Sequence, residues 1–345
     1  MSTPMNRQIV LAARPHGEPK ETDFRRVETP VPEPGPGQIL LRTLYLSLDP
    51  YMRGRMSAGP SYAAATEIGD VMVGGTVCRV EASHVKAFAV GDIVEAYTGW
   101  QERALSDGRG VRKLDTKLAP ITTALGVLGM PGMTAWTGLM SIGEPKAGET
   151  LVVAAASGAV GSVVGQLAKL KGCRAVGIAG GEKKCEYVVN ELGFDACLDH
   201  RRSDFAEALK AACPKGIDIN FENVGGPVFD AVLPLLNTFA RVPICGLIAH
   251  YNATELPSGV DRVPLLLRQV LTKRLTVRGF IVFDFASQQP DFLAEVGPLV
   301  RDGRIKYRED IVEGLENAPR ALIGLLRGEN FGKVIVRVAP EDLPG

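Results

Sequence analysis

The residues that point most directly to chemistry form a stretch of small side chains in the middle of the chain. Gly158 and Gly161 occupy the second and third glycine positions of a G-x-G-x-x-G pattern, and Ala156 stands at the first. The apolar run 149–153 before this stretch predicts a buried strand, and 164–171 after it predicts a helix. A strand, a tight turn and a helix N-terminus together bind a dinucleotide, because the N–H groups and the dipole of the helix face its pyrophosphate.

The next predicted strand, 174–179, ends where a dinucleotide site selects its cofactor. Glu182 has about the offset of a carboxylate that binds the ribose 2′-hydroxyl of NAD, although the start of a helix favours an acid in any case. Two glycines before it leave room for a 2′-phosphate, and Lys183 and Lys184 supply positive charge, with more at 200–202. We favour NADPH over NADH, and two solvated charge clusters are the alternative interpretation.

The composition of the 345-residue chain excludes several classes of function. Its 39 basic and 39 acidic residues cancel, which leaves no electrostatic footprint for nucleic acid or for an anionic membrane surface. No apolar run approaches the roughly 20 residues of a membrane span, and the first residues lack the apolar core of a signal peptide. Six scattered cysteines without C-x-x-C spacing indicate unpaired thiols, and we therefore expect a cytoplasmic protein.

Two patterns of elements predict two domains. Residues 7–125 are rich in short strand signals, whereas strands and helices alternate from about residue 129, which is typical of an α/β doubly wound parallel sheet. The terminal run 332–338 predicts a strand that rejoins the β-rich part, since a lone strand must pair with a sheet. The predicted strands are 38–48, 71–80, 91–97, 150–154, 174–179, 196–198, 217–222, 241–245 and 275–282, and the predicted helices include 183–191, 204–211 and 226–236.

Several motifs, the glycine turn among them, carry a resemblance to a known family. They lie at 47–56, 128–136, 156–161, 222–226, 245–252 and 328–333. Together they resemble the zinc-independent medium-chain dehydrogenase/reductases over nearly the whole chain. The similar branch is that of leukotriene B4 12-hydroxydehydrogenase and prostaglandin reductase, with its bacterial curcumin reductase-like members. The resemblance implies a Rossmann NADPH-binding domain at 131–302 and a GroES-like, β-rich catalytic domain formed by 1–130 and 303–345.

The resemblance also implies residues that bind the phosphates of NADPH. The pyrophosphate would bind the turn, at Ser157, Gly158, Ala159, Val160 and Gly161. Lys184 would bind the 2′-phosphate. His200 stands where the prostaglandin reductase branch has a tyrosine near the same phosphate, so it stays open whether His200, Arg201 or Arg202 makes this contact.

The nicotinamide half of the cofactor would lie among residues from other segments. Asn223 would sit near the nicotinamide ribose, and Asn330 would reach the cofactor from the other domain. The walls of the nicotinamide site would come from Cys245, Gly246, Tyr251, Phe280, Ile281 and Val282. Without the resemblance, an asparagine before Val-Gly-Gly or before Phe-Gly is as readily a turn residue.

The positions of the cysteines limit the kinds of reaction that the chain is expected to catalyse. Cys78 is the only cysteine before Cys173, so the four-cysteine structural lobe of zinc alcohol dehydrogenases is impossible, and no catalytic metal is expected. We therefore expect NADPH-dependent reduction of the C=C bond of α,β-unsaturated ketones or aldehydes, such as curcumin-like enones and alkenals. Hydride would add to the β-carbon, and the enolate would need hydrogen-bond donors and a proton. The candidate hydrogen-bond donors are the ribose hydroxyl of the cofactor and a tyrosine hydroxyl, and the proton would come from a tyrosine or from water. Tyr251 is the first candidate tyrosine, followed by Tyr51 and Tyr62, and half-buried packing is the alternative role for each.

Two rival functions stay open, and both keep the cofactor. One is an NADPH quinone oxidoreductase, and the other is a non-enzymatic NADPH-binding regulatory protein. The expected partners are a small-molecule enone and a second copy of the chain, paired at the sheet edge near 275–282. The loop-like segment 251–268 predicts either a lid over the substrate or an ordinary surface excursion.

Overall fold

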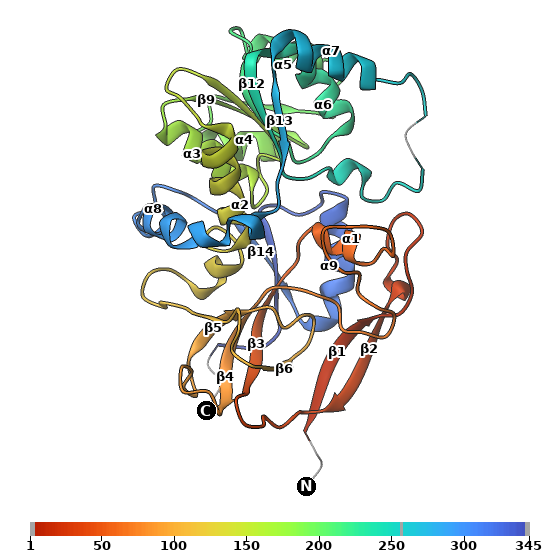
Figure 1. Ribbon diagram of the computed structural model, residues 1–345, viewed down its shortest axis with the longest axis vertical. Helices are drawn as coiled ribbons and strands as arrows, with labels where there is room; N and C mark the ends of the chain where they lie inside the picture. Colours follow the sequence, from red (N-terminus) through yellow and green to blue (C-terminus); the bar gives the residue numbers. More distant parts are fainter. Residues whose placement is uncertain (1–3, 256–257, 342–345) are drawn as a thin grey trace. The chain divides into compact units, whose positions relative to one another are not determined.

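Two large sheets organise the chain, each in a unit of its own (Figure 1). The computed structural model describes residues 4–255 and 258–341. Unit 1 comprises Met1–Gly126 and Glu309–Gly345, and unit 2 comprises Val127–Arg308. Each unit has its own buried apolar core, as expected of two domains.

Unit 2 is built on a six-stranded parallel sheet in the order β10-β9-β8-β11-β12-β13. Its strands are β8 (Thr150–Ala154), β9 (Arg174–Ala179), β10 (Ala196–Asp199), β11 (Ile217–Phe221), β12 (Leu236–Ile244) and β13 (Thr276–Gly279). Its helices are α2 (Met130–Gly138), α3 (Gly161–Leu170), α4 (Glu182–Asn190), α5 (Phe205–Ala212), α6 (Gly226–Val232), α7 (Val263–Lys273) and α8 (Gln289–Arg301). The predicted doubly wound parallel sheet is confirmed.

The sheet is covered on both faces, which explains why its central strands are continuous apolar runs. Every residue of β8 is buried, as are the last five of β9. Helices α3 and α4 pack on one face, and α5, α6 and α7 share a core with the other (Figure 1). Strands β9 and β10 lie on one side of β8, and β11, β12 and β13 lie on the other, so the strand order reverses between β8 and β11. Ligands of such sheets bind at the carboxyl ends of the two strands at this point.

Two predicted elements of unit 2 were too long. The strand predicted at 275–282 ends at Gly279, because Phe280 leaves the sheet and buries its ring 6.2 Å from that of Phe221. The helix predicted at 226–236 is α-helical only to Val232, since Pro234 cannot donate a helical hydrogen bond. The predicted loop 251–268 gives way to α7 at residue 263, and residues 256 and 257 lie outside the described part of the chain.

Unit 1 holds a mixed sheet in the order β14-β15-β3-β4-β5-β7, with β6 also paired to β3, and a separate pair β1-β2. Its elements are β1 (Met5–Leu11), β2 (Phe24–Pro30), β3 (Ile39–Ser47), α1 (Tyr51–Arg55), β4 (Thr76–Ser83), β5 (Ile93–Ala96), β6 (Arg103–Ser106), β7 (Arg112–Lys113), β14 (Glu309–Glu313), α9 (Ala318–Leu326) and β15 (Lys333–Arg337). The predicted return of the terminal strand is confirmed, because β15 pairs antiparallel with β3.

The strand predicted at 71–80 is displaced, and β4 covers Thr76–Ser83 instead. Residues 71 and 72 bind β1, where the Met72 N–H donates to the Ile9 carbonyl at 3.0 Å. The chain then passes Gly74, where a Cβ would lie 2.8 Å from a methyl group of Leu46. In the part of the chain that the structure describes, no helix combines the length and the apolar character needed to span a membrane.

Candidate active site

The turn between β8 and α3 is closed by two glycines and a neighbouring strand. A Cβ at Gly161 would lie 2.4 Å from the Ala155 carbonyl oxygen, and one at Gly158 would lie 3.1 Å from the same atom. Ala155 adopts a positive φ of 53°. Ala156 is fully buried, and its methyl group fits at the first glycine position because Gly177 of β9 has no Cβ, which would lie only 2.8 Å away.

The start of α3 therefore comes close to whatever occupies the turn. The Gly158 N–H donates to Ala155, and the Ser162 N–H donates to Gly158. The first N–H groups of a helix have no partner within it, and with the positive end of the dipole they bind phosphate. The predicted pyrophosphate residues Ser157–Gly161 all lie on this turn and at the start of this ten-residue helix, so the backbone fits a pyrophosphate.

A cluster of positive side chains gathers where β9 and β10 end. The Arg201 guanidinium and the His200 Nε2 both lie 3.1 Å from the position that a Cβ would take at Gly180. Partial burial lowers the pKa of His200, as do the charges of Arg201 and Lys184, whereas Asp199 opposes them. This shift favours the neutral imidazole of His200, which can donate or accept a hydrogen bond.

The structure distinguishes Arg201 from Arg202, which the sequence alone does not. Arg202 points its guanidinium to Asp204, with N–O distances of 2.8 and 2.9 Å, in an exposed ion pair. Arg201 instead lies beside His200 and Gly180. The region around Gly180 therefore fits a 2′-phosphate bound by Lys184, His200 and Arg201.

A buried carboxylate shapes the loop that follows β11. Glu222 is 2% exposed, and its Oε1 accepts hydrogen bonds from the N–H groups of Val224 and Gly225, each at 2.7 Å. The side chain of Asn223 donates to the Ala154 carbonyl at 2.9 Å. Asn223 thus bridges the carboxyl ends of β11 and β8, at the reversal of the strand order. Sequence analysis assigned no role to Glu222.

The loop after β12 packs on the loop after β11. The N–H groups of Ile248 and Ala249 donate to the carbonyls of Asn223 and Val224 at 3.2 and 3.0 Å. Within this loop, the Tyr251 hydroxyl lies 3.0 Å from the position of a Cβ at Gly246. The structure thus brings Gly246, Tyr251 and Asn223 together at one edge of the sheet.

Two predicted wall residues have environments that limit their chemistry. Burial, and then the charge of Glu222, raise the pKa of the Cys245 thiol to about 12, so that Cys245 is not a nucleophile at neutral pH. Phe280 is buried between Phe221 and Phe285, and its ring would clash with a Cβ at Gly138. Its ring is therefore part of the core, while Ile281 is partly exposed and Val282 is buried.

Unit 1 holds a cluster of tyrosines that includes two of the predicted donors. Tyr51 is the first residue of α1, and its hydroxyl lies 2.5 Å from that of Tyr97. Tyr62 is 60% exposed and lies near enough to raise the pKa of both hydroxyls. Sequence analysis assigned no role to Tyr97, although it is the last residue of the strand predicted at 91–97.

A buried ion pair holds the turn that leads into α1. Lys333 Nζ lies 2.9 Å from Asp49 Oδ1 and 2.5 Å from the Leu48 carbonyl oxygen, and both charged side chains are less than one-tenth exposed. Ser47 donates a short hydrogen bond to the second oxygen of Asp49. Because Asp49 lies two residues before Tyr51, this pair fixes the start of the helix that presents the tyrosine.

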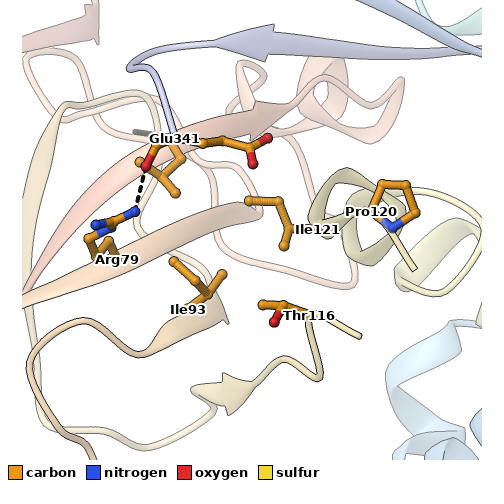
Figure 2. Close-up of a pocket in the computed structure, with 7 residues that line it drawn as sticks. Arg79, Ile93, Thr116, Pro120, Ile121 and Glu341 are labelled. Atoms are coloured by element: carbon orange, nitrogen blue, oxygen red, sulfur yellow. Dashed lines mark hydrogen bonds between the residues drawn. The ribbon is translucent and has the colours of Figure 1, made fainter. Parts of the chain in front are cut away.

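Two other features of unit 1 lie apart from the tyrosines and the buried ion pair. Asn330 donates from its side chain to the Gly332 carbonyl at 2.8 Å, as an asparagine of a turn does. A small pocket lies elsewhere in the unit, where Arg79 binds the Glu341 carbonyl (Figure 2). It is lined by Leu44, Arg79, Ile93, Thr116, Pro120, Ile121 and Glu341, none of which is a predicted site residue.

Across residues 4–255 and 258–341, no three His, Cys, Asp or Glu side chains lie together in a way that could hold a metal ion. The donors that the described site offers are backbone N–H groups, cationic side chains and tyrosine hydroxyls. Such donors bind phosphates and stabilise negative charge that develops on an oxygen.

Comparison with known families matches both units. The family described as "N-terminal domain of oxidoreductase" matches residues 7–114, and the family described as "Zinc-binding dehydrogenase" matches residues 159–296. The second description names zinc for the family as a whole.

Curated relatives and solved structures match over almost the full chain. The NADPH-dependent curcumin reductase of Escherichia coli (strain K12) is 59% identical over 98% of each chain. The NADP(+)-dependent 2-alkenal reductase of Nicotiana tabacum is 41% identical over 97% of this chain and 98% of its own. The structure of CurA from Vibrio vulnificus in complex with NADPH is 57% identical, with a TM-score of 0.94 over 97% of this chain and 99% of that one.

Proposed function

This chain belongs to the zinc-independent medium-chain dehydrogenase/reductases, and we propose that it is an NADPH-dependent reductase of C=C bonds conjugated to a carbonyl group. The observation that carries this proposal is the 59% identity, over 98% of both chains, to a relative named as an NADPH-dependent curcumin reductase. The fold agrees, because a Rossmann sheet and a GroES-like β-rich unit characterise this family. The substrates are enones and alkenals, the class that the sequence predicted.

The residues of unit 2 fit NADPH at both of its phosphate groups. The turn before α3 offers N–H groups and space for the pyrophosphate, and Lys184, His200 and Arg201 offer charge and hydrogen bonds to the 2′-phosphate. Bound NADPH supplies the hydride of the reaction. Asn223, Gly246 and Tyr251, at the carboxyl ends of β11 and β12, would hold the nicotinamide end.

We further propose that unit 1 is the catalytic domain and unit 2 the cofactor domain, and that a tyrosine provides the proton. The reduction leaves negative charge on the carbonyl oxygen and requires a proton at the α-carbon. We propose that hydroxyl donors meet both needs. Tyr51, Tyr62 and Tyr251 are the candidate donors, and Asn330 is proposed to contact the cofactor.

An assay of NADPH oxidation against a panel of acceptors tests the proposed function. The panel runs from short alkenals to diarylheptanoid enones and includes quinones. We expect enones to be reduced at the C=C bond, which mass and NMR analysis of the product shows as a gain of two hydrogens. Faster reduction of quinones than of any enone would favour the quinone oxidoreductase alternative. Tight NADPH binding without turnover of any acceptor would favour the regulatory alternative.

Replacing Lys184 by alanine is expected to weaken NADPH binding about 10- to 100-fold, since a hydrogen bond to a charged group is worth roughly 1.5–3 kcal/mol. NADH binding should change little, because NADH lacks the 2′-phosphate. Fluorescence titration of both cofactors measures the two dissociation constants. Lys183→Ala removes the same charge from the neighbouring, exposed position and is the matched control. An equal loss for NADPH and NADH would contradict the assignment.

A homodimer is proposed as the assembled form. Strand β13 is the edge of the six-stranded sheet, and α7 beside it has no buried residue. Val263, Leu267 and Leu271 of α7 follow one another at intervals of four residues and are each more than half exposed, which forms an apolar surface suited to a second copy. Light scattering is expected to give twice the mass of one chain. Leu271→Glu is expected to shift the measured mass toward that of a single chain. A wild-type monomer would contradict this proposal.

The six cysteines of the described chain are free, and a cytoplasmic location is proposed on this ground. Fractionation of cells with an antibody against the chain tests the location. Recovery in a secreted or periplasmic fraction would contradict it.

A further inference from the structure

Two tyrosine hydroxyls from distant parts of unit 1 meet in a single hydrogen bond. Tyr51 Oη and Tyr97 Oη are 2.5 Å apart, although 46 residues separate them in the chain. Tyr51 is partly buried and packs against the core, whereas Tyr97 is 52% exposed. The pair therefore links a residue that packs against the core to one that faces solvent.

Both partners are held by rigid neighbours. The turn after Tyr97 requires Gly99, which has a φ of 76° and where a Cβ would lie 2.5 Å from the Met72 carbonyl oxygen. Thr98 is bound to Thr76 through their hydroxyls at 2.7 Å. On the other side, the Lys333–Asp49 ion pair fixes the start of α1. Short, aligned hydrogen bonds persist where both groups are positioned in advance in this way.

The charged and titratable groups around the pair keep both hydroxyls protonated. Burial, and then the negative charge of Asp49, raise the pKa of Tyr51 above its ordinary range. Burial raises the pKa of Tyr97 as well, against the opposing charge of Arg55, and Tyr62 raises both. Two protonated hydroxyls that share one hydrogen bond leave one O–H free to donate to a third group.

We propose that Tyr51 and Tyr97 form a proton relay, in which Tyr51 donates to the reduced substrate and Tyr97 is the positioning residue that orients Tyr51 and resupplies its proton from solvent. This proposal rests on the proposed enone reduction. As the O–H bond of Tyr51 breaks, its proton bonds to the α-carbon. The Tyr97 proton passes to the Tyr51 oxygen, and a hydronium ion or buffer acid of the solvent returns one proton to Tyr97 and is left as water or as the conjugate base. The substrate gains one hydride and one proton, and both tyrosines end as they began.

A double-mutant cycle on kcat with an enone tests the relay. Tyr97→Phe is expected to lower kcat about tenfold, because the hydrogen bond that it removes would act on a developing phenolate. KM for the enone and the NADPH dissociation constant should stay within about twofold. Because Tyr97 acts only through Tyr51, the double variant should be no slower than Tyr51→Phe alone. Additive losses in the double variant overturn the relay, as does an unchanged kcat in Tyr97→Phe.

The solvent isotope effect on kcat separates the relay from a structural role. A chain of two protons gives a curved dependence on the deuterium fraction, and Tyr97→Phe should make it linear. Tyr45→Phe is the matched control, since it removes a hydroxyl hydrogen-bonded to Glu341 at 2.7 Å in the same unit. The same loss of curvature in Tyr45→Phe would overturn the assignment to Tyr97.

Alkaline titration of the phenolate absorbance tests the pair without turnover. Hydroxyls that share a hydrogen bond titrate as a coupled pair. Replacing either tyrosine by phenylalanine should therefore change the curve of phenolate absorbance against pH by more than the loss of one independent phenol would. If the wild-type protein reduces no enone, the proposed function fails while this readout still decides the pairing. A change equal to one independent phenol overturns the pairing.

Discussion

Replacing Lys333 by methionine is expected to lower the free energy of unfolding of unit 1 by about 3–5 kcal/mol, the cost of leaving one member of a buried ion pair alone. Lys333 and Asp49 are 4% and 5% exposed as residues, so water cannot solvate the carboxylate that remains. The same change removes the hydrogen bond to the Leu48 carbonyl. The turn into α1 should loosen first, because both lost contacts hold it.

Tryptophan fluorescence can follow unit 1 by itself. The chain has two tryptophans, and Trp100 is buried in unit 1 whereas Trp136 lies in α2 of unit 2. Urea denaturation in a Trp136→Phe background therefore reports unit 1 through Trp100. Lys113→Met is the matched control, since its ion pair with Asp92 is half exposed on the lysine side and should be worth less than about 1 kcal/mol. Equal losses of unfolding free energy in Lys333→Met and Lys113→Met would contradict the idea that burial makes the Lys333–Asp49 pair more important for stability.

A second substitution, Asp49→Asn, completes a double-mutant cycle with Lys333→Met. It distinguishes the effect of the buried charge of Asp49 from that of the shape of its side chain. Lys333→Met with Asp49→Asn removes both charges, and we expect the double variant to regain part of the lost stability. It should not regain the full activity, because the Lys333 contacts that orient the start of α1 are gone.

The parallel sheet could be predicted because its signals are local. β8 and β9 begin and end at the predicted residues, since a continuous apolar run between turn residues is enough to define a buried strand. The imprecise ends are those decided by distant partners. Phe280 leaves the strand predicted at 275–282 because Phe221 offers it a packing site, and no window of sequence around Phe280 contains that residue.

The same distinction applies to the site. The turn at Gly158 and Gly161 was visible as a sequence pattern. The sequence did not explain why alanine fits at position 156, because the space for its methyl group is left by Gly177 on the adjacent strand. Lys333 is 284 residues from Asp49, and Tyr97 is 46 residues from Tyr51. Pairings of this kind depend on how β15, β3 and β5 assemble, which single-sequence patterns do not encode.

Tyr51→Phe is expected to lower kcat with an enone by about 100-fold or more, which is the contribution that a positioned general acid makes. The sequence ranked Tyr251 first because it follows a parallel strand at the ligand edge. The proposed relay gives the donor role to Tyr51, whose hydroxyl is bound to that of Tyr97 and whose turn is fixed by a buried ion pair. Tyr62→Phe and Tyr251→Phe are expected to change kcat less than Tyr51→Phe does.

Steady-state kinetics of the three variants, with NADPH binding measured separately, distinguish proton donation from loss of the cofactor site. A larger loss in Tyr251→Phe would return the donor role to unit 2, and wild-type kcat in all three would contradict a tyrosine donor. The pH profile adds an independent check. Because the pKa of Tyr51 is raised, its protonated form persists above the ordinary tyrosine value near 10. Any loss of activity between pH 8 and about 10 must therefore come from a group other than Tyr51, and it should persist in Tyr51→Phe.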